Sequence, residues 1–229
     1  MLPATTFGRL YYTRTRTLSP VAPPTLTISD DSLTDRQKDV LDAALGLLVD
    51  GGDGLTMTGV ARRASCSKET LYKWFGDRDG LLTATVQWQA SKVRMVPVDR
   101  DTLDKRTLAI ALEKFGRDWL TVLTGETSVA LNRLAVTHAG QEKRNLGAIV
   151  LENGPIGMSR RCMPLLEAGR EAGLLDFDDA DQTFRTFFGL VVRDTQIRML
   201  LGEQRRPSEE KIVAQARRAR EQFFALFGA

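Results

Sequence analysis

The segment ASCSKETLYKWF, residues 64–75, holds several polar side chains that are close enough in sequence to act together. Hydroxyl, ammonium and phenol groups follow one another there, and all of them can donate hydrogen bonds to an anionic partner. Leu71, Trp74 and Phe75 supply an apolar stripe at helical spacing, so the segment predicts a surface helix with its polar face outward. This face favours non-covalent recognition of negatively charged groups.

Two helices are expected before this segment, and they decide what it can recognise. Thr34 followed by Gln37 matches a capping box, which predicts the start of a helix. Thr56 can cap a short second helix, MTGVARRA. Residues 65–67 are enough only for a tight turn, so the two short helices form a helix-turn-helix, whose second helix can enter the DNA major groove, about 12 Å wide. The sequence therefore predicts DNA binding.

The expected DNA contacts fall into two classes. Residues at the start of the recognition helix and one turn later suit phosphate, because free amides and the helix dipole attract anions there. Short or flexible side chains between them can reach base edges. A further helix begins with Asp77 as its cap, and the arginine after it points to the same region. The first class contains Ser67, Lys68, Tyr72, Lys73 and Arg78, and the second contains Lys68, Glu69 and Thr70.

A catalytic or metal site is not expected. His138 is the single histidine, and no nucleophile with a base, pair of placed carboxylates or phosphate loop accompanies it. Cys66 and Cys162 lie far apart without Cys-x-x-Cys spacing, which argues against zinc and against a disulfide framework. The sequence predicts no enzyme activity, no cofactor and no metal. It leaves open a redox-responsive regulator through Cys66, which stands near the charge of Lys68.

The composition is that of a globular chain that tolerates anionic partners. Its 229 residues are 42% hydrophobic and 27% charged, with a formal net charge of +3 and an isoelectric point near 9.0. No run approaches the roughly 18 apolar residues of a membrane helix, and no secretory signal opens the chain, so a cytoplasmic protein without membrane attachment is expected. Residues 1–32 are rich in Thr and Pro and predict a disordered arm, with DNA contact by its arginines as the alternative.

The rest of the chain predicts a helical domain with a small-molecule site. The helix expected at about 103–123 carries an apolar stripe that includes Phe115, and a break is expected at 153–155, where Pro155 fits a first helical position. Polar groups stranded among apolar helices indicate a cavity for an apolar or aromatic effector, although each residue taken singly fits core or surface equally well. The candidate effector residues are Trp119, Arg133, His138, Met163, Phe187 and Arg193.

The helix around 184–201 is apolar on two sides and needs two partners. Phe184 and Phe187 lie on one stripe, while Leu190 and Ile197 lie on a second. Other helices of the same chain can cover only one of them, so the second stripe predicts a homodimer.

The segment LTMTGVARRASCSKETLYKWFGDRDGLL resembles the DNA-binding domain of the TetR/AcrR family of transcriptional regulators, and the C-terminal half is loosely similar to AefR-related members. The resemblance implies an all-α homodimer that binds operator DNA, and it adds Thr56 and Thr58 to the DNA contacts. One departure is that Ser65 and Cys66 stand where the family's turn usually has glycine and an aliphatic residue, and serine adopts a left-handed conformation only at some cost.

These observations together predict an all-α chain in three parts. Residues 1–32 are the arm, 33–80 the helix-turn-helix domain and 81–229 the ligand-binding and dimerisation domain. The expected function is a ligand-responsive transcriptional regulator, most simply a repressor that a small molecule releases from its operator. The alternative is a helical scaffold without an effector.

Overall fold

The computed structural model describes residues 33–51, 55–139, 146–203 and 205–229, which fold into helices without a β-strand. This confirms the predicted all-α fold class, while the predicted N-terminal arm lies outside the described residues. None of the helices in these ranges is long and apolar enough to cross a membrane.

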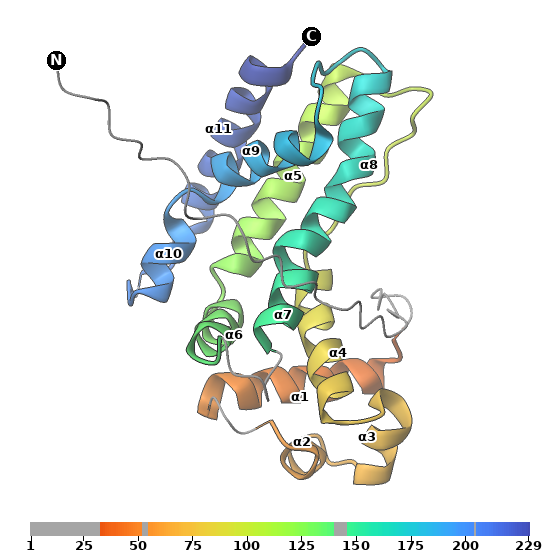
Figure 1. The fold of residues 1–229 in the computed structure, drawn as a ribbon, viewed down its shortest axis with the longest axis vertical. Coiled ribbons are helices and arrows are strands. Elements are labelled where there is room, and N and C mark those ends of the chain that lie inside the picture. The colour runs from red at the N-terminus through yellow and green to blue at the C-terminus, as the bar shows by residue number, and fades with distance from the viewer. Residues whose placement is uncertain (1–32, 52–54, 140–145, 204) are drawn as a thin grey trace, which may run out of the picture.

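The lower end of the molecule in Figure 1 consists of three short-to-medium helices, and a fourth runs from them into the upper part. These are α1 (Asp35–Gly51), α2 (Met57–Arg63), α3 (Lys68–Phe75) and α4 (Arg78–Ser91). The predicted capping box is present, because the Thr34 N–H donates to Gln37 Oε1 at 2.9 Å and the Gln37 N–H donates to Thr34 Oγ1 at 3.3 Å. Side chains cap the next three helices in the same way, each accepting the amide of the third residue on.

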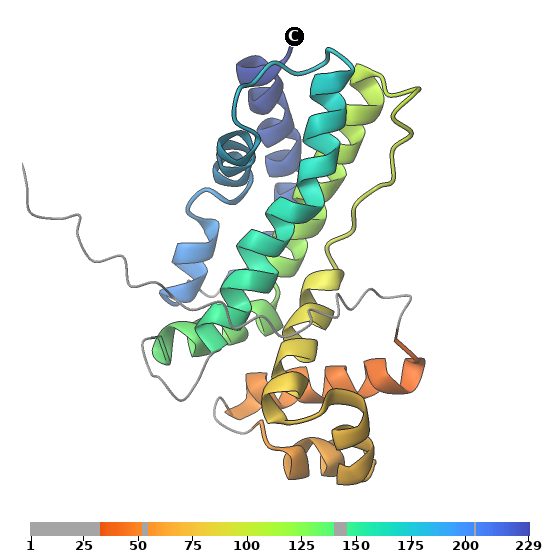
Figure 2. The ribbon, with the colours of Figure 1, turned by 45° about the vertical axis from the view of Figure 1, so that its right-hand side comes forward.

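The upper part contains the remaining helices, which Figure 2 shows from a second side. They are α5 (Lys105–Leu123), α6 (Glu126–Thr137), α7 (Leu146–Leu151), the π-helical turn η2 (Glu152–Ile156), α8 (Gly157–Glu171), α9 (Ala180–Val192), α10 (Thr195–Leu200) and α11 (Glu209–Phe227). The long helices α5, α8 and α11 run up the molecule, and α9 crosses them and packs against α8 and α11.

Two hydrophobic cores hold these helices. The first lies among α1, α2, α3 and α4, where Val40, Leu71 and Leu81 are fully buried. α6 and α7 contribute Leu131 and Leu146 to it. The second is aromatic and lies among α5, α8, α9 and α11. Burial of these apolar side chains is the main force that fixes the helices, since helices this short are marginal alone. α4 and the α7–α8 segment contribute to both cores.

The predicted break at 153–155 is a kink inside a continuing helix. Gly154 has non-helical dihedral angles, φ −86° and ψ −107°, and Pro155 follows it within the π-helical turn. A proline lacks the amide that a regular helix needs, and a π-turn absorbs that loss without ending the helix. The chain therefore bends between α7 and α8 at this point, instead of leaving the helix as the sequence predicted.

Arg193 ends α9 with a backbone conformation, φ 49° and ψ −131°, that L-residues rarely adopt and that costs about 1–3 kcal/mol. Its side chain is exposed, so glycine at this position relieves the strain without loss of packing. We expect Arg193→Gly to raise the free energy of unfolding by about 1 kcal/mol, measured by urea denaturation. The matched control is Arg185→Gly in the middle of α9, which should lower it by a similar amount. A lower midpoint for Arg193→Gly than for wild type would contradict the strain at this residue.

Candidate nucleic-acid interface and adjoining groove

The turn between α2 and α3 is closed by backbone bonds and by one left-handed residue. Ser65 has φ 49°, a left-handed conformation. The sequence predicts this conformation, because Ser65 stands where similar turns have glycine. The Cys66 N–H donates to the Ala61 carbonyl at 2.9 Å, and the Ala64 N–H donates to the Val60 carbonyl at 2.8 Å. The turn therefore keeps helix-turn-helix geometry although serine replaces glycine.

Arg36 of α1 holds this turn, a role that sequence reasoning missed. Its Nη2 donates to the Ala64 carbonyl at 2.6 Å and to the Ser65 carbonyl at 2.9 Å. Both carbonyls stand at the C-terminal end of α2, where a cation is favoured by the free carbonyls and the helix dipole. No signal in the sequence points to this contact, because its partners are main-chain atoms 28 and 29 residues away. The clamp fixes the angle at which α3 leaves the turn.

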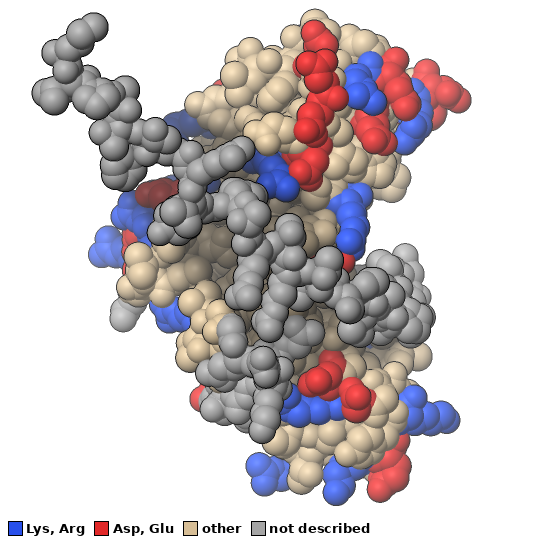
Figure 3. Space-filling view, in the orientation of Figure 1, with Lys and Arg blue, Asp and Glu red and all other residues tan. Residues whose placement is uncertain are grey.

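The nine residues predicted to contact DNA lie on α2, α3 and the two helix starts that frame them. Tyr72 is 52% exposed although it is aromatic, and Lys68, Glu69 and Lys73 are exposed beside it. Thr56, Thr58 and Ser67 are exposed, whereas Thr70 and Arg78 are half-buried. Figure 3 shows lysine and arginine side chains at this lower end, with acidic ones among them. The surface thus has a mixed charge and protrudes from the molecule.

Two hydroxyl groups of this surface already accept hydrogen bonds from the backbone. Thr56 Oγ1 accepts from the Gly59 N–H at 3.0 Å, and Ser67 Oγ accepts from the Thr70 N–H at 3.1 Å. Ser67 Oγ also lies 3.1 Å from Thr70 Oγ1, where either hydroxyl can be the donor. The Thr56 hydroxyl, which accepts from the backbone, can donate its own proton to a phosphate oxygen.

Two charged residues of the set are bound locally. The Glu69 amide and then the Ser67 hydroxyl hydrogen-bond the Glu69 carboxylate, and they hold the pKa of that carboxyl below its ordinary value. Glu69 therefore stays ionised and can accept a bond from a base amino group, as carboxylates do from cytosine. Arg78 Nε donates to the Leu55 carbonyl at 2.9 Å, so this side chain also ties α4 to the segment before α2.

The six predicted effector residues are dispersed. Trp119 and Phe187 belong to the second core, and Arg193 caps α9. Arg133 donates to the carbonyls of Met199 at 2.6 Å and Leu200 at 3.2 Å, which ties α6 to α10. His138 is buried at the end of α6 with its Nδ1 2.9 Å from the Leu134 carbonyl. Of the six, Met163 is the one that lines the groove between α8 and α9.

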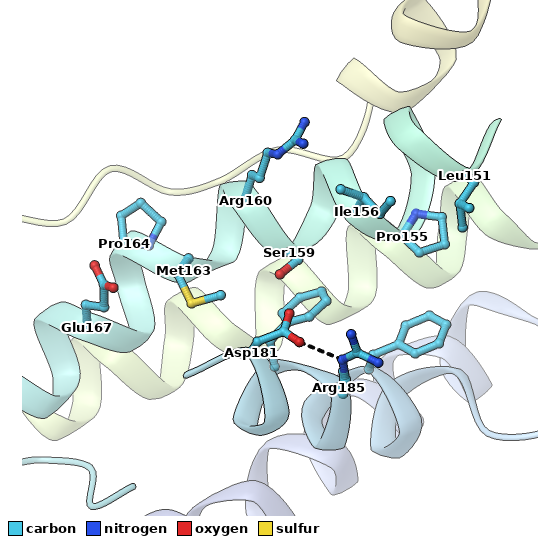
Figure 4. Close-up of a pocket in the computed structure, with 12 residues that line it drawn as sticks. Leu151, Pro155, Ile156, Ser159, Arg160, Met163, Pro164, Glu167, Asp181 and Arg185 are labelled. Atoms are coloured by element: carbon cyan, nitrogen blue, oxygen red, sulfur yellow. Dashed lines mark hydrogen bonds and ion pairs between the residues drawn. The ribbon is translucent and has the colours of Figure 1, made fainter. Parts of the chain in front are cut away.

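This groove has a volume of about 810 Å³ and lies at the kink. Figure 4 shows side chains of η2 and α8 on one side and of α9 on the other. Its lining consists of Leu151, Pro155, Ile156, Ser159, Arg160, Met163, Pro164, Glu167, Asp181, Phe184, Arg185 and Phe188. Most residues of this set are apolar. One of them, Leu151, is 54% exposed. The groove is therefore an apolar surface that a small molecule could cover.

Trp119 stands behind the groove as its second layer. Its ring lies 5.8 Å from that of Phe184 and 5.0 Å from that of Phe188, measured between ring centres, and both phenylalanines line the groove. Two ion pairs sit at the rim, Arg185 with Asp181 at 2.7 Å and Arg160 with Glu152 at 2.6 Å. Figure 4 marks the first of them. Apolar walls with a few polar groups at the mouth are typical of a small-molecule site.

The two cysteines differ in environment. Burial raises the pKa of the Cys162 thiol, so it stays protonated and unreactive. Cys66 is free and half-buried in the turn, and its redox role stays a prediction. Within the described ranges, no group of His, Cys, Asp and Glu could hold a metal ion.

Comparisons with known proteins match both halves of the chain to one kind of regulator. Residues 40–85 match the family described as bacterial regulatory proteins, tetR family. Residues 110–229, more than half of the chain, match the C-terminal domain described as AefR-like transcriptional repressor.

Individual proteins agree with these matches. The crystal structure of a TetR transcriptional regulator from Agrobacterium tumefaciens is 48% identical, with a TM-score of 0.72 over 86% of this chain and 96% of that one. The flavonoid-responsive regulator FrrA is 25% identical, with a TM-score of 0.62 over 84% of this chain and 97% of that one. The HTH-type transcriptional regulator BetI of Burkholderia cenocepacia (strain HI2424) is 32% identical over 83 residues, which are 33% of this chain and 43% of BetI. Because the match to the C-terminal domain covers most of the upper helices and the DNA-binding match covers the turn and both helices around it, the chain belongs to the TetR family of transcriptional regulators.

Proposed function

We propose that the protein is a transcriptional repressor that leaves its operator when a small molecule binds between α8 and α9. TetR-family regulators bind operator DNA and dimerise. The description of the matched C-terminal domain as that of a repressor supports the sense of regulation. The observation that carries the ligand response is the groove of about 810 Å³, since small-molecule sites commonly measure about 300–1,000 Å³. Operator binding places its action in the cytoplasm.

The operator contacts proposed are the nine residues of the lower end. The exposed ammonium, phenol and hydroxyl groups of α3 and the α2 start bind phosphates and fix the register of α3 on the duplex. Lys68, Glu69 and Thr70 face the base edges, and the ionised Glu69 gives this face an acceptor between donors. A positively charged surface without such an acceptor would bind DNA with less sequence preference.

The effector proposed is a planar aromatic molecule with hydroxyl groups. Phe184 and Phe188 contribute aromatic side chains to the lining from α9, and Met163 points toward α9 from α8. The ion pair of Asp181 and Arg185 at the rim supplies an acceptor and donors for hydroxyl groups. The relative FrrA is described as flavonoid-responsive, and a flavonoid has this chemistry.

Filling the groove tests the proposal. We expect Met163→Trp to occupy the space that an aromatic effector needs, so release from DNA should require at least about tenfold more effector, equal to about 1.4 kcal/mol. The measurement is fluorescence anisotropy of a labelled duplex from upstream of the protein's own gene, titrated with the flavonoid naringenin. The matched control is Val136→Trp, which adds the same bulk to an exposed position on α6.

The outcomes separate the candidate functions. Equal release of wild type and Met163→Trp would place the effector outside the groove. Tight operator binding that no aromatic probe disturbs would contradict the effector proposal and favour a DNA-binding helical protein without an effector.

A further inference from the structure

The helix that joins the two parts of the molecule is held at both ends. At its start, Arg78 binds the Leu55 carbonyl, and along its side the Trp88 indole donates to Asp42 of α1 at 2.8 Å. α4 therefore moves together with the DNA-reading helices. At its end, the last carbonyls of the helix lack partners within the helix, as in every α-helix. What binds those carbonyls decides how α4 is oriented in the upper part.

Arg161 of α8 binds that end. Its Nη1 donates to the Ala90 carbonyl at 2.8 Å and lies 3.4 Å from the Val93 carbonyl, 71 and 68 residues away in sequence. The side chain is half-buried and forms no ion pair with a described carboxylate. Burial lowers the pKa of its guanidinium from the ordinary value, yet arginine remains charged. The carbonyls at the end of α4 stabilise this half-buried charge in place of a carboxylate, because the C-terminal end of a helix favours a cation.

The same helix forms one wall of the groove. Figure 4 shows Ser159 and Met163, on either side of Arg161 in sequence, pointing from α8 toward α9. Met158 and Cys162 of α8 are buried in the second core. α8 thus presents three separate sides: one to the groove, one to the core and one, through Arg161, to α4.

The kink separates the packing of α8 from that of the helix before it. α7 packs in the first core through Leu146, whereas α8 packs in the second, and the two meet at Gly154. A rotation of α8 about this point changes the position of Arg161 without moving α7. Such a rotation therefore changes the contact between Arg161 and α4.

We infer that Arg161 is a positioning residue that sets the orientation of α4, and with it the spacing of the two DNA-reading units of a dimer, according to the position of α8. This inference rests on the proposed function. An occupant of the groove that shifts α8 withdraws the guanidinium from the Ala90 carbonyl and frees the end of α4. Operator binding and effector binding then oppose each other to the same degree, because coupling between two sites is reciprocal.

The test compares two DNA probes with three variants. The probes are a palindromic duplex from upstream of the protein's own gene and a duplex that carries one half-site. Arg161→Met removes the donors but keeps the apolar stem, and Arg161→Lys keeps the charge. Arg170→Met is the matched control, at an exposed position of α8 outside the groove lining. Binding to one half-site needs one DNA-reading unit and does not depend on the angle of α4. Binding to the palindrome needs both units in register.

We expect Arg161→Met to bind the palindrome about tenfold more weakly than wild type, within the usual range of allosteric coupling, and the half-site equally well. Arg161→Lys should lose about threefold on the palindrome, because an ammonium does not reproduce the planar fork of arginine. Arg170→Met should behave like wild type on both probes.

The alternatives are distinguishable. Equal loss on both probes would show a merely structural role and overturn the inference, as would palindrome binding by folded Arg161→Met within twofold of wild type. If Arg161→Met does not fold, wild-type affinity of Arg161→Lys for the palindrome overturns it. Failure of the wild type to bind either probe would instead overturn the proposed function.

Discussion

Replacement of Phe187 by alanine is expected to lower the free energy of unfolding by about 3–5 kcal/mol, the largest effect of any single change considered. Phe187 has no exposed surface, and its ring centre lies 6.4 Å from that of Phe115 and 5.2 Å from that of Phe223. It therefore joins α5, α9 and α11 at one point, and its loss leaves a cavity that three helices cannot close together. Urea denaturation at a fixed protomer concentration measures the change.

The matched control is Phe188→Ala on the same helix. Phe188 is half-buried and lines the groove. Its replacement should lower the free energy of unfolding by roughly half as much, because this side chain buries less apolar surface on folding. A loss below about 1.5 kcal/mol for Phe187→Ala would contradict its place in the core. Such a result would return this residue to the effector site in which the sequence had placed it.

Removal of Lys73 is expected to weaken operator binding about 100-fold and to reduce its salt dependence. One change removes two phosphate contacts from a dimer, each worth about 1.4 kcal/mol, or tenfold. The slope of log K against log salt should fall by about 1.8, since each lost contact contributes about 0.9. Fluorescence anisotropy from about 0.05 to 0.2 M salt, a range where such contacts matter, measures both quantities. Lys73 is exposed on α3, so the variant should keep wild-type stability.

The residues that face bases should behave differently. Lys68→Ala and Thr70→Ala are expected to change which operator sequence is preferred, with about 1–3 kcal/mol less discrimination at one base pair. Lys211→Ala, at an exposed position of α11, is the control and should change neither affinity nor salt slope. If Lys73→Ala kept the wild-type slope while folded, α3 would not be the DNA-contacting helix.

The helix-turn-helix could be predicted from sequence because its signals are local. The capping box at Thr34 and the caps at Thr56 and Ser67 join residues three positions apart, and their hydrogen bonds are present in the structure. The stripe that includes Leu71 repeats with the helical period and is buried. Local rules of this kind need no knowledge of what a helix packs against.

The groove could not be predicted because it depends on how η2, α8 and α9 pack in three dimensions, which periodicity along the chain does not specify. Periodicity identified Trp119 as inward-facing, which it is, but an inward-facing residue can fill a core or line a cavity. Trp119 fills the core, and two phenylalanines of α9 stand between it and the groove. Arg133 was interpreted as a free polar group, whereas the structure binds it to carbonyls of α10 some 66 residues away.

Arginine contacts with the main chain could not be predicted from the sequence. Arg36 at the turn and Arg161 at the end of α4 both bind helix-terminal carbonyls. A carbonyl acceptor has no residue type, so no charge pattern announces the pairing. Both contacts join helices that are far apart in the sequence.

Selection of binding sites from a random pool of duplexes determines whether this chain reads operator DNA as a symmetric dimer. The wild-type protein should enrich one palindromic sequence, and Lys68→Ala should enrich a sequence changed symmetrically in both half-sites, because each protomer contributes the same α3. Enrichment of no sequence, or of the same sequence by both proteins, would contradict the account.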